Sequence, residues 1–295
     1  MDKIYLFSFK FLKFIVEILP KSSLNSFTKT VGNIAFKLNK KHRNIAKANL
    51  DLAYGDELSS IEKLDIIKRT YQNFGRFGAD FILNQNSTKE FILSKVSFKN
   101  THFFEKALSL GHPIIIQTAH YGNWELFSLA MSAKYGSLSI IGRSLDSDVM
   151  NEILSQNRTQ FNIELIDKKN ATRSVIRALK DKRLLGILTD QNTTKKDGIE
   201  VEFFGRRVLH TPAASVFANK MNAIIIPTFI YQNSSGIDEI CFFEPIDIKK
   251  FDKENAIKKA TQLQANATEK IIKQKPDEYF WFHKRFKHFY EEAYE

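Results

Sequence analysis

The sequence predicts an α/β fold in which a mainly parallel sheet is flanked by helices, with a helical region before it. From about residue 111 onward, short apolar runs alternate with helix-length stretches, the pattern of parallel strands joined by crossover helices. Residues 21–110 instead carry apolar side chains at three- and four-residue spacing, which is typical of amphipathic helices. With 295 residues and 43% apolar content, the chain can bury one substantial core but is short for two independent domains.

We expect three segments: a hydrophobic, membrane-associating helix over residues 1–20, a helical part over 21–110, and an α/β core over 111–295. The core strands are predicted from five apolar runs: 113–119, 137–142, 163–166, 184–189 and 223–231. The helices between them are predicted over 124–134, 148–161, 171–182 and 212–220. Two further runs, CFFEPI at 241–246 and FFGRRV at 203–208, are candidates to extend the sheet at an edge.

Composition points to an anionic partner and a reducing compartment. The formal net charge is +11 and the pI is near 9.5, which suits a lipid head group, an acidic carrier protein or nucleic acid, and charge alone does not choose among them. The single cysteine, Cys241, excludes an internal disulfide, and thiols stay reduced inside cells.

The N-terminal run KIYLFSFKFLKFIVEILP predicts an amphipathic helix in a membrane interface. Its charged residues fall near one side of a helix while aromatic and aliphatic residues cover the rest. A membrane span needs roughly 20 mostly apolar residues, and charges interrupt this run before Pro20. It has no small-residue cleavage site, so we expect no removable signal peptide. Packing on the protein's own core is the alternative, and a tilted or re-entrant anchor also stays open.

The run HYGNWE supplies a candidate base at the end of the first predicted strand of the core. His120 ends that strand and Glu125 follows five residues later, so the two meet if His120 lies on the turn and Glu125 in the first turns of the helix. With Glu125 holding its ring, His120 can take a proton from an attacking hydroxyl. A structural histidine and a favourable charge at a helix N-terminus are the alternatives.

The sequence gives no sign of a covalent intermediate or a metal site. It contains no G-x-S-x-G elbow, and Cys241 lies in a run expected to be a buried strand, so direct transfer is the simpler hypothesis. No second histidine stands at metal-ligand spacing and there is no C-x-x-C, so no metal is predicted.

Six motifs occur in order between about residues 110 and 288: TAHYGNWE, IIGR, SQNR, ILTDQN, VEFFGRRVLHTPAA and PDEYFWFHKRFK. Together they resemble the bacterial lipid A biosynthesis acyltransferase family, part of a wider group of glycerolipid acyltransferases with an H-x-x-x-x-D pattern. This sequence has Glu125 where that group usually has Asp, and Ala119 where it often has Asn. Both departures point to the lipid A branch.

The resemblance implies an enzyme at the cytoplasmic face of the bacterial inner membrane, in contact with inner membrane phospholipids. It would move an acyl chain from acyl carrier protein to a hydroxyacyl chain of a Kdo-lipid A precursor. The donor thioester on the carrier's phosphopantetheine is the only cofactor implied, and no nucleic acid partner is expected. Carried over by motif position, His120 and Glu125 would be the catalytic pair, and Arg158 in SQNR would help to form the active site.

Other polar positions are candidates for substrate binding. Arg143 follows a predicted strand and suits an oxyanion or a phosphate, although a surface salt bridge is as good an explanation. Asp190 and Gln191 follow another strand and would orient substrate or Arg158, or form a buried polar network. The remaining candidates are Asn123 in HYGNWE, and Arg206 and Arg207, which suit a lipid phosphate or the acidic carrier.

Two other functions stay open at this point. The motifs do not separate lipid A from another acceptor, such as a glycolipid or a lysophospholipid. A non-catalytic basic protein that binds membranes or nucleic acid is a different class, but most Phe residues fall inside periodic apolar runs, which core packing explains better.

Overall fold

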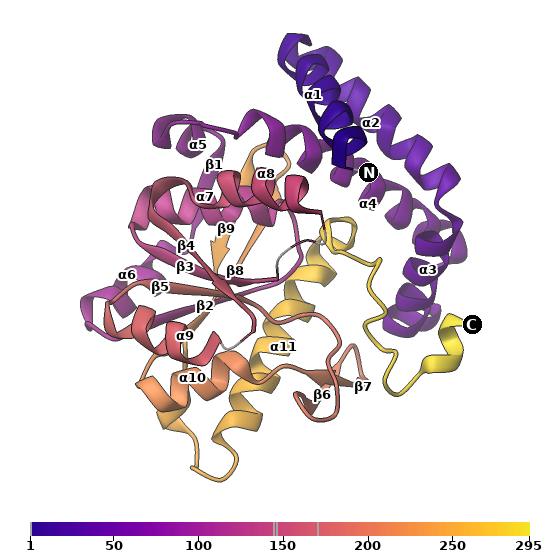
Figure 1. The fold of residues 1–295 in the computed structure, drawn as a ribbon. Coiled ribbons are helices and arrows are strands. Elements are labelled where there is room, and N and C mark those ends of the chain that lie inside the picture. Colours follow the sequence, from indigo (N-terminus) through magenta and orange to yellow (C-terminus); the bar gives the residue numbers. More distant parts are fainter. Residues whose placement is uncertain (1, 144, 146, 170) are drawn as a thin grey trace.

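The computed structural model describes residues 2–143, 145, 147–169 and 171–295 (Figure 1). Its main sheet has eight strands in the order β1-β9-β8-β2-β5-β3-β4, with β10 also paired to β8. The strands are β1 (Val96–Lys99), β2 (Ile114–Thr118), β3 (Leu138–Gly142), β4 (Ile163–Asp167), β5 (Leu184–Leu188), β8 (Ile224–Gln232), β9 (Asp238–Phe242) and β10 (Ile246–Asp247). Neighbours from β8 through β4 run parallel, whereas β9 is antiparallel to β8. The predicted α/β fold with a mainly parallel sheet is therefore confirmed.

Helices cover both faces of the sheet (Figure 1). Because side chains alternate across a strand, Ile114 and Ile116 pack into one buried cluster, and Ile115 between them packs into another. The first face carries α6 (Thr101–Ser109) and α7 (Trp124–Tyr135). The second face carries α9 (Ala171–Lys180), α10 (Ala213–Met221) and the start of α11 (Ala256–Gln274). The remaining core helices are α5 (Lys89–Ser94) and α8 (Asp148–Arg158).

The N-terminal part is a group of helices beside the sheet: α1 (Asp2–Ile18), α2 (Lys21–Leu38), α3 (Lys40–Tyr54) and α4 (Ser60–Leu83) (Figure 1). Helices α2 and α4 cross at two glycines, since a Cβ at Gly32 would lie 2.6 Å from the Tyr71 carbonyl oxygen and one at Gly75 would lie 2.4 Å from that of Thr28. On α1, Val16 is buried, and no helix within the described residues is long and apolar enough to cross a membrane.

The structure differs from the sequence-based expectations at the sheet edges. The run 203–208 does not extend the main sheet but forms the turn of a separate hairpin, β6 (Ile199–Phe203) and β7 (Arg206–His210). Phe204 and Gly205, with φ of 53° and 65°, make the two-residue turn with left-handed backbone that favours such hairpins. Strand β9 lies inside the sheet because β1, from the mainly helical part of the chain, pairs outside it.

After α11, the chain returns along the ends of the strands toward α3 (Figure 1). The Asn49 side chain, fully buried on α3, donates to the carbonyl oxygens of Trp281 and His283 at 2.6 and 2.8 Å. These contacts join residues more than 230 positions apart and fix the C-terminal segment against the helical part.

Candidate active site

His120 lies on a tight turn just after β2, and the turn is fixed by neighbouring backbone. Gly122 has a φ of +59°, and a Cβ there would lie 1.9 Å from the Ile230 carbonyl oxygen, so only glycine fits. The Gly122 N–H donates to the Glu278 carbonyl at 2.9 Å, and the Phe280 N–H donates to the His120 carbonyl at 2.9 Å. The C-terminal segment therefore holds in place His120, the residue that the sequence predicts to be the base.

Asp190, not Glu125, holds the His120 ring. It follows β5, which pairs in parallel with β2, so the two strands end side by side. Its Oδ1 accepts from Nδ1 of His120 at 2.9 Å and from the His120 backbone N–H at 3.1 Å. A carboxylate at Nδ1 selects the tautomer with the proton on that nitrogen and leaves Nε2 as the base.

Burial and charge set the protonation of this pair. Burial acts to lower the pKa of His120, but the charge and hydrogen bond of Asp190, helped by Glu125, raise it above the ordinary 6.5. Burial acts to raise the pKa of Asp190, and the contacts with His120 outweigh it and bring that pKa to about 2. Asp190 is thus ionised at neutral pH although its side chain is only 2% exposed, while His120 keeps 24% exposure.

Glu125 lies in the first turn of α7 and pairs with Arg158 at the end of α8, which corrects the expected contact with the ring. The guanidinium binds the carboxylate in a bidentate way, with Nε to Oε2 at 2.8 Å and a second contact from Nη2 to Oε1. The Trp124 indole also donates to Oε1 at 3.1 Å. His120 lies on the turn before α7, and the Glu125 carboxylate binds Arg158 instead of the ring, so its influence on His120 is electrostatic.

Four half-buried aromatic residues form a wall beside His120: Phe74, Trp124, Phe280 and Phe282. The His120 ring lies 5.2 Å from that of Trp124 and 6.0 Å from that of Phe280, centroid to centroid. Phe74 contacts three other members at 5.3–5.7 Å. An apolar wall beside a base suits the hydrocarbon part of a lipid substrate.

The chain matches known proteins in two comparisons. The family model for bacterial lipid A biosynthesis acyltransferases matches residues 3–288. The chain belongs to that family. Two curated relatives, the phosphatidylinositol mannoside acyltransferases of two Mycobacterium tuberculosis strains, are each 19% identical over 136 residues. Each match covers 45% of this chain and 43% of the relative's length.

Asn123, Gln191 and Arg143 are further predicted site residues of this family member. Asn123 is buried and caps α7, with its Oδ1 accepting from the Leu126 N–H at 3.2 Å and its Nδ2 donating to Asp80 at 3.1 Å. Both the oxygen and the nitrogen of its side-chain amide therefore already form hydrogen bonds within the protein. Gln191 is half-buried next to Asp190, and Arg143 is exposed directly after β3.

The two hairpin arginines are exposed but already have partners. Arg207 forms a bidentate pair with Glu200 at 2.6 and 2.8 Å, and its guanidinium lies 4.5 Å from the Phe289 ring centroid. Arg206 donates to the Leu52 carbonyl at 3.4 Å. The apolar residues around them, Val201, Phe203 and Phe204, pack in the core.

Sequence reasoning missed the residues of the C-terminal motif that surround the Asp190 carboxylate. Tyr279 is buried against it, and burial followed by the charge of Asp190 raises the tyrosine pKa. Arg285 is fully buried and donates to the Leu209 carbonyl at 2.6 Å, with His210 Nδ1 at 2.9 Å from its other terminal nitrogen. The motif PDEYFWFHKRFK drew attention to this segment, but nothing in the spacing of its residues predicts a contact with Asp190.

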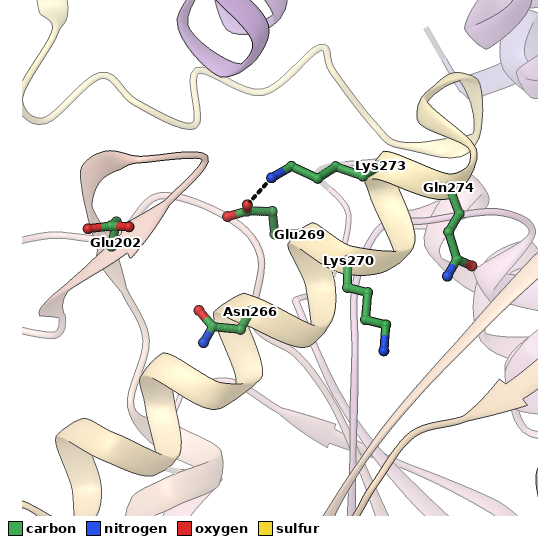
Figure 2. A pocket seen from close by; sticks show the side chains of 6 residues that line it. All are labelled: Glu202, Asn266, Glu269, Lys270, Lys273 and Gln274. Atoms are coloured by element: carbon green, nitrogen blue, oxygen red, sulfur yellow. Dashed lines mark hydrogen bonds and ion pairs between the residues drawn. The ribbon is translucent and has the colours of Figure 1, made fainter.

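A cleft of about 430 Å³ lies elsewhere on the protein, between α11 and β6 (Figure 2). Its lining is polar and charged: Glu202, Asn266, Glu269, Lys270, Lys273 and Gln274. Lys273 pairs with Glu269 at 2.5 Å, and Glu269 also accepts from the Phe204 N–H at 2.5 Å. Neither His120 nor Asp190 lines this cleft.

Proposed function

We propose that this acyltransferase moves a fatty acyl chain from acyl carrier protein to the hydroxyl of a hydroxyacyl chain on a Kdo-lipid A precursor. The observation that carries the proposal is the partly exposed His120, with Asp190 at Nδ1 and an aromatic wall beside it. Family membership supports a lipid A acceptor.

In the proposed mechanism, Nε2 of His120 takes the proton of the acceptor hydroxyl as its oxygen attacks the thioester carbonyl. The tetrahedral adduct collapses, the carbon–sulfur bond breaks, and the imidazolium returns its proton to the departing thiolate. Asp190 stabilises the imidazolium, which is the role of the third member in triad chemistry. No covalent acyl-enzyme is formed.

Glu125 and Arg158 have a different role in this mechanism. Their bidentate pair is partly buried, with side chains 17% and 21% exposed, and it joins α7 to α8 beside the base. Arg158 Nη1 lies near Gly142, since a Cβ built on that glycine would be 3.7 Å from it. We propose that this end of the guanidinium faces the charge that develops on the carbonyl oxygen.

We also propose that the protein works at the cytoplasmic face of the inner membrane. On α1, Phe7, Phe11 and Phe14 are 72%, 56% and 60% exposed, which is costly in water. On α2, Ile34 and Leu38 are 51% and 79% exposed. Apolar side chains beside lysines on helices suit an anionic bilayer surface, and the net charge of +11 also suits acidic carrier protein.

A second acceptor class is favoured by one specific observation. The mycobacterial relatives are named for acyl transfer to phosphatidylinositol mannoside, a glycolipid. Acyl transfer to a glycolipid other than lipid A uses the same base and the same apolar wall, so the product decides between the two acceptors.

The test is a reconstituted transfer reaction with the full-length protein. Acyl carrier protein loaded with an acyl thioester is offered with Kdo-lipid A precursor, with phosphatidylinositol mannoside or with a lysophospholipid, and products are analysed by mass spectrometry. The proposal expects one acyl chain added to the lipid A precursor for each free thiol released. Transfer only to another acceptor would overturn the lipid A assignment, and the absence of transfer with every acceptor would overturn the reaction.

Two histidines that flank β2, one before it and one after it, provide the variant and its control. His120→Ala should lower kcat by about 10²–10⁴-fold, the usual contribution of a general base. His112→Ala changes a half-buried histidine just before β2, at the opposite end of the strand, and should leave kcat unchanged. Substantial turnover by the folded His120→Ala protein would remove His120 from the mechanism.

A further inference from the structure

The C-terminal segment contacts both loops that carry the His120–Asp190 pair, and the proposed reaction leaves one of these contacts unexplained. Phe280 binds the loop after β2 through the His120 carbonyl, as described above. Farther along, Nε2 of His283 accepts a hydrogen bond from the backbone N–H of Asn192 at 3.0 Å. Asn192 is two residues beyond Asp190, so this histidine holds the loop after β5.

We propose that His283 is a positioning residue: its Nε2 fixes the backbone of Asn192 and so keeps the Asp190 carboxylate against the His120 ring. This inference rests on the proposed function, because it gives His283 a role in the same site. His283 is not a catalytic residue in this proposal, since it acts on the base only through the loop that carries Asp190.

His283 is rigid enough for this role because its own backbone is held. Its carbonyl accepts from Asn49 Nδ2 at 2.8 Å, and the Asn49 Oδ1 accepts from the Arg285 N–H at 3.3 Å. Asn49 is fully buried, and the Tyr294 hydroxyl also donates to its Oδ1 at 2.5 Å. Each end of the Asn49 amide thus restrains a residue of the segment that carries the His283 ring.

The contact requires Nε2 of His283 to be unprotonated, and its surroundings keep it so. Burial lowers the pKa of His283, Asp190 acts in the opposite direction, and the charges of Arg285 and His120 lower it further, with a net value below 6.5. The pKa of His120 is raised. As pH falls, His120 therefore takes up its proton first, and the His283–Asn192 contact persists wherever His120 is a base.

Loss of the acceptor should affect the base in two ways. The Asn192 N–H would lack its partner, so the loop would shift and the contact between Asp190 and His120 would weaken. The rate would fall because fewer molecules hold the ring in position. The pKa of His120 would also move down toward its ordinary value, because Asp190 is the main group that raises it.

Two variants test the acceptor at this position, and a third serves as a control at another histidine. Glutamine in His283→Gln offers an oxygen that can accept from the Asn192 N–H, whereas His283→Leu keeps bulk and offers none. We expect kcat to fall about tenfold or more in His283→Leu with KM little changed, and to stay within about threefold of wild type in His283→Gln. The acid limb of the kcat profile should move to lower pH in the leucine variant only. His288→Leu, at a half-buried histidine whose ring packs on Phe289, is the matched control.

A second measurement does not depend on catalysis. Hydrogen exchange at the Asn192 amide, measured at one pH, should be faster in His283→Leu and as slow as wild type in His283→Gln. If the leucine variant does not fold, His283→Ala with and without added imidazole replaces it, and imidazole should restore both the exchange protection and the rate.

Two results would overturn the proposal: a folded leucine or alanine variant with unchanged Asn192 exchange and an unmoved acid limb, or a glutamine variant as impaired as leucine. Failure of the proposed function looks different, because wild type would then transfer no acyl chain while the exchange difference at Asn192 remained.

Discussion

At the scale of single residues, the contact between Asp190 and Nδ1 of His120 gives the sharpest prediction. Asp190→Asn should lower kcat by about 10²–10⁴-fold, because an amide can donate to Nδ1 and so favour the tautomer in which Nε2 carries the proton. The remaining activity should show its acid limb at lower pH, since the charge that most raises the pKa of His120 is gone.

The measurement is kcat against pH, with Glu202→Gln, in the lining of the separate cleft, as the control carboxylate. A folded Asp190→Asn protein with an unchanged acid limb would show that Asp190 does not tune the base. Circular dichroism of each variant separates loss of tuning from loss of fold.

The sequence singled out His120 but paired its ring with the wrong carboxylate, for a physical reason. Glu125 is near His120 in the chain, whereas Asp190 is 70 residues away and meets it only because β2 and β5 are adjacent. Strand order is set by packing of the whole sheet, and a single sequence does not report it. The sequence did show that His120 and Asp190 each follow a predicted strand. That position indicated that both residues lie at the same edge of the sheet.

At the scale of elements, the turn after β2 predicts a strong effect of a single methyl group. Gly122→Ala places a Cβ against the Ile230 carbonyl oxygen and forces a left-handed φ on a residue with a side chain. We expect the free energy of unfolding to fall by at least about 3 kcal/mol, the sum of overpacking and backbone strain. Gly78→Ala, on α4 with open space around the added methyl, should instead raise it by about 0.5–1 kcal/mol. Urea denaturation of both variants measures the contrast, and a Gly122→Ala protein as stable as wild type would contradict the close approach.

Helix α1 carries the element-scale test of membrane association. Replacement of Phe7, Phe11 and Phe14 by Ser should weaken binding to phosphatidylglycerol vesicles about tenfold or more, because burial of one phenyl ring in an apolar phase contributes about 1.5–3 kcal/mol. Co-sedimentation measures the partition. Phe91→Ser, at an exposed phenylalanine on α5, should leave it unchanged. Equal binding of the triple variant and wild type would place the membrane contact elsewhere or show that there is none.

Helix α11 was missed in the sequence in part because three of its eight buried side chains are polar. Helix α11 buries Thr261, Gln264 and Thr268 against the sheet, where they bond to Ser215 and Gln117. A search for apolar periodicity does not mark such a face. Strand β1 was missed for another reason: it has four residues, and its pairing with β9 is decided 140 residues later.

At the scale of the whole molecule, the ends of the chain close around the sheet through a buried polar network. His210 at the end of β7 is fully buried, and burial followed by the charge of Arg285 lowers its pKa to about 3. Its Nδ1 lies 2.9 Å from the Arg285 guanidinium, which requires that nitrogen to be an acceptor. The network therefore needs a neutral His210 to hold the C-terminal segment over the site.

This requirement predicts how stability depends on pH. In the unfolded chain His210 titrates near 6.5, and in the folded protein it stays neutral down to about 3. Between these values the unfolded state binds the extra proton, so acidification destabilises the fold by at most about 1.4 kcal/mol per pH unit from this residue. His210→Gln keeps an acceptor for Arg285 and removes the titration. Its free energy of unfolding, measured with urea at pH 7, 6, 5 and 4, should fall less steeply than that of wild type, with the difference appearing below pH 6.5. Parallel curves for the two proteins would mean that His210 is protonated in the folded state. That result would contradict a buried network in which a neutral His210 accepts from Arg285.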